Sequence, residues 1–163
     1  MSKNITTYEN FTQLRKEFHP TKNGNQQLKN FAYHSHKKFW WRCRLGHEWE
    51  TIIKERTRGR NCPYCSGRRV SAENNLKVLF PRLVEEWHPT KNGKFQPEHF
   101  TKASGRKVWW VCKKGHEWKT MIPNRTIQKQ GCPYCAGRRV SADNNLKVLF
   151  PKLAKEWHLT KNG

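Results

Sequence analysis

The chain is small and carries a large positive charge, and this combination excludes several classes of protein. Only 34% of its 163 residues are hydrophobic and the mean hydropathy is −1.05, so any core is small. No apolar run approaches the roughly 18 residues that a membrane-spanning helix needs. Lysine and arginine number 33 against 12 acidic residues, a net charge of +21. That excess favours a polyanionic partner, and we expect nucleic acid rather than a membrane; a solvated charged tail is the competing explanation.

The chain repeats itself with a period of 69 to 70 residues. Segment 62–93 matches segment 132–163 at 26 of 32 positions, and the stretches upstream of both also align. The predicted boundaries are an N-terminal extension at 1–13, a first module at 14–82, a second module at 83–152, and a partial third repeat or C-terminal cap at 153–163.

Each module is expected to contain a β-hairpin. In the second module, Val108–Cys112 is β-branched and aromatic, and Glu117–Ile122 alternates in polarity, so both segments are predicted to be strands. Neighbouring residues on a strand point to opposite faces. One tryptophan of Trp109–Trp110 is therefore expected inside and the other partly outside, and the same holds for Trp40–Trp41. A loop is expected after the second strand.

A helical segment follows the hairpin. Apolar residues recur at helical spacing from Leu76 to Trp87, and Ser71 or Asn75 can cap its start. Pro81 interrupts the pattern, which predicts two short helices, or one kinked helix, with the proline in the first turn of the second part. We expect this segment and its copy, Leu146–Trp157, either to belong to the module before them, as a C-terminal cap, or to be part of an array that is cut short of a further domain.

All six cysteines fall into a duplicated frame. Each frame reads Cys-x3-His, a gap of 14 or 15 residues, and Cys-Pro-Tyr-Cys, which offers three sulfurs and one imidazole to a tetrahedral ion. We therefore predict two structural zinc ions, and we expect modules this small to need them for folding. The predicted ligands are Cys43, His47, Cys62 and Cys65 in the first frame and Cys112, His116, Cys132 and Cys135 in the second.

Two alternatives to these ligand sets exist. His19, His88 and His158 also recur at the repeat period and could supply the fourth ligand, although packing beside a helix explains them equally well. Disulfides would require an oxidising compartment, and the segment Met1–Thr6 has no apolar export signal. Reduced thiols and the missing signal predict a cytoplasmic location.

Basic residues gather around both Cys-Pro-Tyr-Cys motifs. Arginine can hold a phosphate or the edge of guanine with two hydrogen bonds, so these clusters are the expected nucleic-acid contacts. Alternatively, the arginines beside the motif offset the negative charge of zinc bound by three thiolates, and both roles can coexist. The predicted contacts are Lys54, Arg56, Arg58, Arg60, Arg68, Arg69, Arg125, Lys129, Arg138 and Arg139.

The sequence offers little for catalysis. Asp143 is the only aspartate, and no carboxylate pair stands beside a histidine in a local motif. A closed Cys3His site also leaves no open metal position. We therefore expect a binding protein rather than an enzyme.

The repeated pattern is Trp-x-Cys-x3-His-Glu-Trp, an arginine-bearing loop, Cys-Pro-Tyr-Cys-x-Gly, and a helix ending in Glu-Trp-His-x-Thr-Lys-Asn-Gly. It resembles the tandem zinc-ribbon, or treble-clef, repeats of bacteria and their mobile elements, over nearly the whole chain from Leu14 to Gly163. The resemblance implies small α+β modules, two in tandem, each a β-hairpin with short helices stabilised by metal. Such repeats often stand beside nuclease domains and are taken to bind nucleic acid, whereas this chain has a divergent start and no nuclease.

Charge and resemblance together indicate a zinc-dependent nucleic-acid-binding protein. Double-stranded DNA is favoured, with arginine and lysine contacting phosphates and base edges. RNA binding is the alternative within this class. From another class, a protein-interaction adaptor that docks a nuclease or polymerase through its tryptophan and zinc surfaces stays open.

Overall fold

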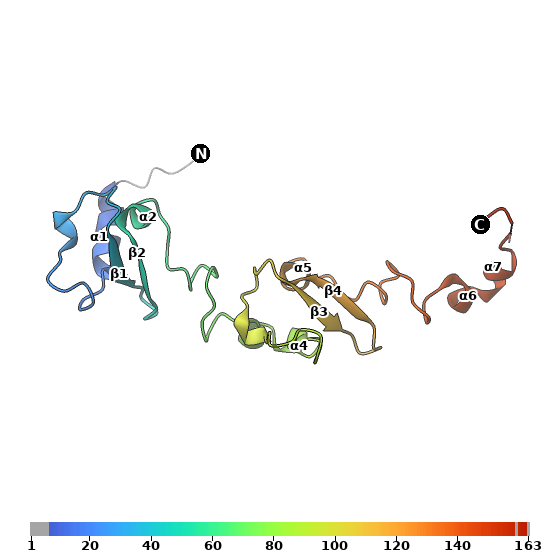
Figure 1. Ribbon diagram of the computed structural model, residues 1–163. Coiled ribbons are helices and arrows are strands. Elements are labelled where there is room, and N and C mark those ends of the chain that lie inside the picture. Colours follow the sequence, from blue (N-terminus) through green and yellow to red (C-terminus); the bar gives the residue numbers. More distant parts are fainter. Residues whose placement is uncertain (1–6, 159, 163) are drawn as a thin grey trace. The chain divides into compact units, whose positions relative to one another are not determined.

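A computed structural model describes residues 7–158 and 160–162 (Figure 1). Packing divides the chain into two units, and the boundary between them in the sequence falls between Ser71 and Ala72. The repeat boundaries at 14, 83 and 153 rest on sequence similarity and stay a prediction. Residues 1–6 of the predicted extension, which include the segment without an export signal, lie outside the described residues, as do positions 159 and 163 of the predicted partial repeat.

The first unit combines an N-terminal helix, a β-hairpin and a helix of 5 residues. Its elements are α1 (Thr7–Glu17), η1 (Leu28–Asn30), β1 (Lys38–Arg42), β2 (Glu48–Ile52) and α2 (Ile53–Thr57). Figure 1 shows α1 and α2 beside the antiparallel hairpin. The loop expected after the second strand begins with the helix α2 and continues without helix or strand through residues 58–61.

The second unit repeats this hairpin and precedes it with two short helices. Its elements are α3 (Leu76–Leu79), α4 (Pro81–Val84), η2 (Pro97–His99), β3 (Lys107–Val111), β4 (Glu117–Met121), α5 (Ile122–Thr126), α6 (Leu146–Leu149) and α7 (Pro151–Lys155). The prediction of two helices divided at Pro81 is confirmed. The Asn75 side chain caps α3 by accepting a hydrogen bond from the Val78 backbone N–H at 3.1 Å.

Both predicted hairpins are confirmed and share one register. In the second, Trp110 lies opposite Trp118 across the two strands. Trp110 is fully buried and Trp109 half-buried, as the alternation of faces predicts. The first hairpin pairs its tryptophans in the same way.

Each unit has one small core rich in aromatic side chains. The first core consists of Leu14, Leu28, Phe39, Trp41, Cys43, Trp49, Ile53 and Cys62. The second consists of Leu76, Trp87, Phe100, Val108, Trp110, Trp118, Ile122 and Cys132. The segment 76–87 therefore packs against the hairpin that follows it, in the second unit.

The repeated Thr-Lys-Asn-Gly turn is fixed to the edge of the hairpin by its asparagine. Asn92 accepts a hydrogen bond from the Trp109 backbone N–H at 2.8 Å and donates one to the Trp109 carbonyl at 2.9 Å. Asn23 makes the same two bonds to Trp40. A neighbouring strand would satisfy the same two groups, so the side chain closes part of an edge that would otherwise be open.

The helices α6 and α7 repeat the sequence of α3 and α4 in a different environment. Leu76 is 1% exposed and its counterpart Leu146 is 39% exposed; Trp87 is 9% exposed and its counterpart Trp157 is 50% exposed. No residue of α6 or α7 belongs to either core of the described chain. The same sequence is thus core in one copy and surface in the other.

Candidate metal centres

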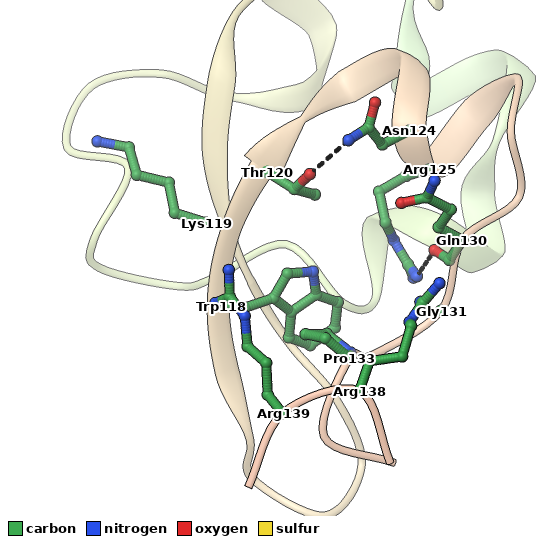
Figure 2. A pocket seen from close by; sticks show the side chains of 10 residues that line it. All are labelled: Trp118, Lys119, Thr120, Asn124, Arg125, Gln130, Gly131, Pro133, Arg138 and Arg139. Carbon is green, nitrogen blue, oxygen red and sulfur yellow. Dashed lines mark hydrogen bonds between the residues drawn. The ribbon is translucent and has the colours of Figure 1, made fainter. Parts of the chain in front are cut away.

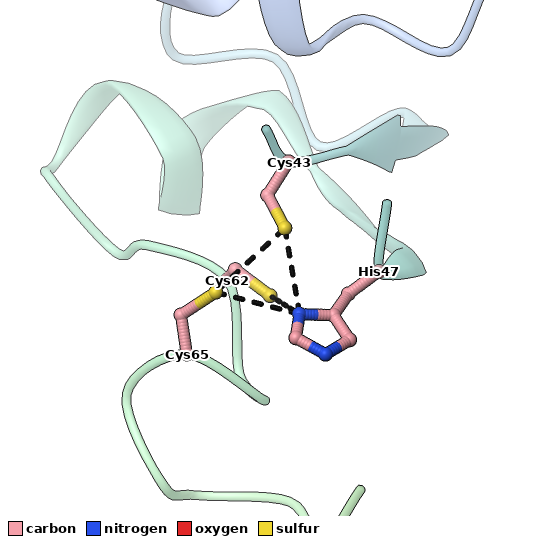
Figure 3. Close-up of side chains that lie close together, drawn as sticks. All are labelled: Cys43, His47, Cys62 and Cys65. Atoms are coloured by element: carbon pink, nitrogen blue, oxygen red, sulfur yellow. Dashed lines mark hydrogen bonds between the residues drawn. The ribbon is translucent and has the colours of Figure 1, made fainter. Parts of the chain in front are cut away.

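The first centre joins the turn of the β1–β2 hairpin to the Cys-Pro-Tyr-Cys loop (Figure 3). The backbone N–H of Cys43 donates to the His47 carbonyl at 3.1 Å, and the N–H of Gly46 donates to the Cys43 carbonyl at 2.9 Å. Gly46 has φ of +82°, a left-handed conformation that favours glycine. This tight turn brings the Cys43 sulfur and the His47 ring to the same point.

The ligand atoms of the first centre have the spacing of a zinc tetrahedron. The Cys43 and Cys65 sulfurs are 3.7 Å apart, and His47 Nδ1 lies 3.5, 3.8 and 3.4 Å from the sulfurs of Cys43, Cys62 and Cys65. Zn–S bonds of about 2.3 Å and a Zn–N bond of about 2.0 Å give tetrahedral edges of roughly 3.5 to 3.8 Å. A disulfide would need about 2.05 Å between sulfurs, so the site fits zinc and not a cystine.

The second centre has the same geometry. His116 Nδ1 lies 3.5, 3.7 and 3.4 Å from the sulfurs of Cys112, Cys132 and Cys135. The Cys112 and Cys135 sulfurs are 3.8 Å apart. In both centres the four ligand atoms lie within 4.8 Å of one another. The chain therefore has two Cys3His sites for structural zinc, each made from one predicted set of residues.

The Cys-Pro-Tyr-Cys loop is a turn and not the start of a helix. The N–H of Ser66 donates to the Cys62 carbonyl at 3.0 Å, and the N–H groups of both Arg68 and Arg69 donate to the Pro63 carbonyl at 2.8 and 2.9 Å. The second loop makes the same bonds. Each zinc loop therefore also fixes the backbone of the arginine pair that follows it.

Without metal, the thiols of one centre have very different acidities. Burial raises the pKa of Cys112, but hydrogen bonds from the backbone N–H groups of Lys114 and His116 outweigh it, and the pKa falls to about 7. Burial and the neighbouring sulfurs of Cys112 and Cys132 raise the pKa of Cys135 to about 11. Three thiolates at this spacing therefore need a bound cation near neutral pH.

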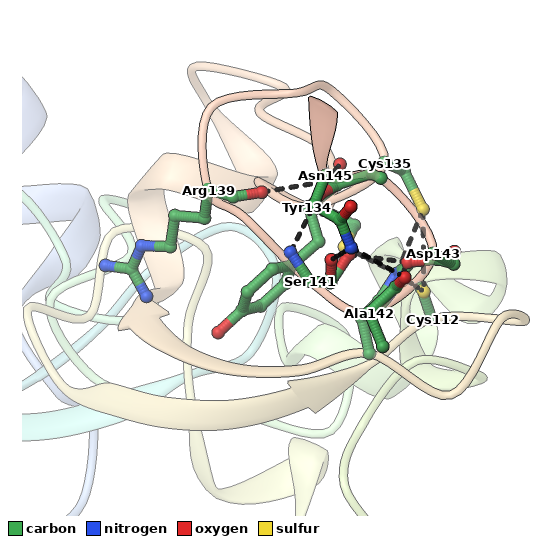
Figure 4. Close-up of polar contacts among 11 residues, drawn as sticks. Cys112, Tyr134, Cys135, Arg139, Ser141, Ala142, Asp143 and Asn145 are labelled. Carbon is green, nitrogen blue, oxygen red and sulfur yellow. Dashed lines mark hydrogen bonds and ion pairs between the residues drawn. The ribbon is translucent and has the colours of Figure 1, made fainter. Parts of the chain in front are cut away.

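Asp143, which is not one of the four predicted zinc ligands, orients the ligand His116 through a hydrogen bond. His116 Nε2 donates to Asp143 Oδ1 at 2.8 Å, since its Nδ1 faces the sulfurs. Ser141 Oγ donates to the same oxygen at 2.5 Å, and these bonds, from Ser141 and then His116, lower the pKa of Asp143 to about 2. Figure 4 shows Asp143 between Ser141 and the Cys112–Cys135 pair. The sequence identifies Asp143 only as a lone carboxylate, because its contact with His116 spans 27 residues.

The other periodic histidines are not ligands. His88 is buried, its Nε2 lies 2.7 Å from Glu117 Oε1, and its Nδ1 accepts a hydrogen bond from the Lys91 N–H at 3.2 Å. His19 makes the equivalent contacts in the first unit. His158 Nδ1 accepts from the Lys161 N–H at 3.3 Å. These histidines hold the turn that follows each helical segment.

Two of the predicted nucleic-acid contacts are buried. Arg56 is 4% exposed and pairs with Glu17, and Arg125 is 9% exposed and pairs with Glu86. Burial lowers the pKa of both guanidinium groups, while the paired carboxylate raises it. Both arginines are committed to the core, which corrects the expectation that they contact nucleic acid.

The remaining predicted contacts lie at or near the surface. Lys54 is half-buried, with its Nζ 3.1 Å from His36 Nε2. The exposed residues are Arg58, Arg60, Arg68, Arg69, Lys129, Arg138 and Arg139.

Each arginine pair borders a hollow. The first hollow, about 270 Å³, lies between Trp49, Pro63 and the pair Arg68–Arg69. The second hollow, about 340 Å³, lies between Trp118, Pro133 and the pair Arg138–Arg139 (Figure 2). The same surface feature therefore recurs in both modules.

Two units, each with a hairpin, short helices and a Cys3His cluster that fits structural zinc, define a tandem pair of zinc finger modules. The chain belongs to the probable treble clef zinc finger domain family, whose sequence profile matches residues 14–68 and 83–138. It is also 31% identical over 106 residues to the cell cycle checkpoint protein RAD17 of Mus musculus. That match covers 62% of this chain but only 15% of the relative.

The described helices include none with the length and apolar character needed to cross a membrane.

Proposed function

We propose that the chain is a zinc-dependent nucleic-acid-binding protein that favours double-stranded DNA. The observation that carries this proposal is the recurrence of an exposed arginine pair beside a hollow at the same place in both modules. Two consecutive N–H groups bonded to one proline carbonyl hold the backbone of each pair, at 2.8 and 3.1 Å in the second module. The fixed backbone keeps the two guanidinium groups of a pair near each other, and guanidinium groups suit the phosphate oxygens of a nucleic acid.

The charge of the whole chain supports the same partner. A net charge of +21 on 163 residues repels itself unless an anion neutralises it. Contacts to phosphates release the ions condensed on nucleic acid, which makes such binding strong at low salt and weak at high salt.

The placement of the hairpin tryptophans favours a duplex over a single strand. Binders of single strands stack bases on exposed aromatic rings. Here Trp41, Trp110 and Trp118 are buried, and the half-buried Trp109 has Lys91 Nζ 4.9 Å from its ring centroid. DNA is favoured over RNA because arginine reads guanine in the major groove of B-form DNA, whereas the major groove of an RNA helix is too narrow for side chains.

A protein-interaction adaptor is the second candidate, and one observation favours it. The exposed apolar residues in α6 and α7 and directly beside them include Leu149, Phe150, Leu153 and Trp157. An exposed apolar cluster can dock another protein, such as a nuclease or a polymerase. Binding of that kind depends on burial of apolar area and so responds little to salt.

A binding role fits the metal centres better than a catalytic one. Four protein ligands occupy all the coordination positions of each tetrahedral zinc ion, so no position is left for a substrate or an activated water. We also propose a cytoplasmic location, because zinc-bound thiolates persist best in a reducing compartment.

The test is a mobility-shift titration of the zinc-loaded chain against duplex DNA, single-stranded DNA and RNA over a salt series. We expect the tightest binding to duplex DNA, with log K falling against log salt by about 0.9 for each phosphate contacted. If the chain binds none of the three nucleic acids, or if its affinity does not change with salt concentration, this proposal is wrong and the protein-interaction adaptor is favoured.

A further inference from the structure

The two hollows have equivalent residues at the floor but different residues at the rim. Each floor has a buried tryptophan and the proline of Cys-Pro-Tyr-Cys, which are Trp49 and Pro63 in the first hollow and Trp118 and Pro133 in the second. The rims come from equivalent elements, β2 with α2 and β4 with α5. Differences in ligand binding must therefore come from the rim side chains.

Carboxylates line the first hollow and are absent from the lining of the second. Glu50 of β2 corresponds to Lys119 of β4, and Glu55 of α2 corresponds to Asn124 of α5. Glu55 Oε2 also pairs with Arg60 Nε at 2.6 Å, which neutralises part of the positive charge there. Glu50 and Lys119 each follow a buried tryptophan on a strand, so their charged groups point to the opposite face, and Lys119 Nζ lies 6.0 Å from the Trp109 ring centroid. A phosphate that enters the first hollow therefore meets the carboxylate of Glu55, whereas in the second hollow it meets the neutral Asn124.

The arginines also differ in what they already bind. Arg68 Nε donates to Ser66 Oγ at 3.1 Å, and its guanidinium also donates to the Asn61 carbonyl. In the second loop Ala136 stands in place of Ser66. Within the described residues, the Arg138 side chain has no hydrogen bond or ion pair. Its donors are available to a ligand, while those of Arg68 must first give up protein partners.

We propose that the second hollow, beside Arg138 and Arg139, is the main phosphate site of the chain and holds a phosphodiester of the bound nucleic acid. This inference rests on the proposed function and deepens it. The first hollow has an equivalent tryptophan and proline but is partly neutralised by Glu55, so the first module contributes weaker contacts. Figure 2 shows Arg138 and Arg139 beside Trp118 and Pro133, whereas the Lys119 side chain points away from them.

The experiment compares matched substitutions in the full, zinc-loaded chain, with a short DNA duplex as the probe. Arg138→Gln and Arg68→Gln remove the same charge at equivalent positions of the two modules. We expect Arg138→Gln to lower duplex affinity about tenfold and to reduce the salt slope by about one, and Arg68→Gln to lower affinity less than about threefold.

Two further variants separate the site from overall charge. Asn124→Glu places the residue of the first module, Glu55, in the second hollow, and Ala103→Glu makes the same charge change at an exposed position that does not line the hollow. Asn124→Glu should weaken binding several-fold more than Ala103→Glu. The reverse exchange, Glu55→Asn, should strengthen binding and steepen the salt slope. Zinc content and circular dichroism of each variant must equal those of the unmodified chain.

Equal losses from Arg138→Gln and Arg68→Gln, or from Asn124→Glu and Ala103→Glu, would overturn the assignment to the second hollow and leave nucleic-acid binding in place. Failure of the unmodified chain to bind the duplex would overturn the proposed function as well.

Discussion

Arg56 and Arg125 are core residues despite their charge. The guanidinium of Arg125 lies 5.4 and 5.3 Å from the ring centroids of Trp110 and Trp118 and pairs with Glu86. Arg56 has the same surroundings in the first unit. A planar guanidinium packs on aromatic faces, so it can occupy space in the core of a module that has few apolar side chains. Each pair also ties the helical segment before the hairpin to the helix after it.

Asp143 is expected to strengthen zinc binding at the second centre. Asp143→Asn removes the carboxylate that orients His116 and supports its basicity through the 2.8 Å hydrogen bond. We predict that one of the two zinc equivalents then binds about 10 to 100 times more weakly. Competition against a chromophoric chelator measures this.

The conservative variant Asp143→Glu keeps the charge and serves as the control, because the first module has Glu73 at this position. It should retain most of the affinity. If Asp143→Asn releases zinc no more readily than the unmodified chain, Asp143 has no role in the centre.

Lys129 is expected to carry backbone strain. Its φ of +53° is left-handed, and the first module has Gly59 in the corresponding turn, with φ of +84°. A side chain in this conformation costs about 1 kcal/mol or more relative to glycine. We therefore predict that Lys129→Gly raises the stability of the zinc-loaded second module by about 1 kcal/mol in urea unfolding.

Lys129→Ala removes the charge but keeps the strain, so it should not stabilise the module. Equal stabilisation by alanine and glycine would show that charge repulsion, and not φ, is the cause.

For single residues, the sequence predicts the zinc ligands well, but it predicts poorly the residues that contact those ligands or pair in the core. The ligands follow from Cys-x3-His and Cys-Pro-Tyr-Cys, whose spacing is set by the tight turns that hold two ligands at once. Asp143 and the buried pair Arg125–Glu86 are contacts between residues far apart in sequence. In a chain with 33 basic residues, no local pattern separates a buried arginine from an exposed one.

Among the elements, the segment α3–α4 and its copy α6–α7 differ most in environment. Trp87 packs edge-on against Trp110, with ring centroids 5.4 Å apart, and is part of the second core. Trp157 is half exposed and belongs to neither described core. One sequence therefore contributes to folding in one place and presents an apolar surface in the other.

This contrast gives a paired prediction. Trp87→Ala should destabilise the second module by about 3 to 5 kcal/mol, the usual cost of deleting a buried large aromatic side chain. Trp157→Ala should change stability by less than about 0.5 kcal/mol, as exposed substitutions do. Thermal melts of the zinc-loaded variants compare the two directly, and equal losses would show that α6 and α7 are packed in solution.

The sequence predicts the hairpins and the divided helix because each has a local signature: strand alternation, paired tryptophans, and a proline at the helix start. It misses α2 and α5, since five residues hold too little of a helical period to recognise. It also leaves open which module the segment 76–87 joins. That choice depends on which aromatic core Leu76 and Trp87 can enter, a property of the assembled module.

At the scale of the whole molecule, bound metal takes the place of a large core. Each unit buries one small aromatic cluster, and Cys43 and Cys62 in the first unit and Cys132 in the second belong both to a core and to a zinc centre. Structural zinc contributes on the order of 10 kcal/mol or more to modules of this kind near neutral pH. The ion also holds the Cys-Pro-Tyr-Cys loops, whose following arginines form the rims of the two hollows.

The most direct test measures zinc content and circular dichroism on the same sample during titration with a chelator. We predict two zinc equivalents per chain in the purified protein, with the hairpin and aromatic signals lost in proportion to the zinc removed. An unchanged spectrum after both ions are shown to be gone, or a native protein whose cysteines are oxidised to disulfides, would contradict the account.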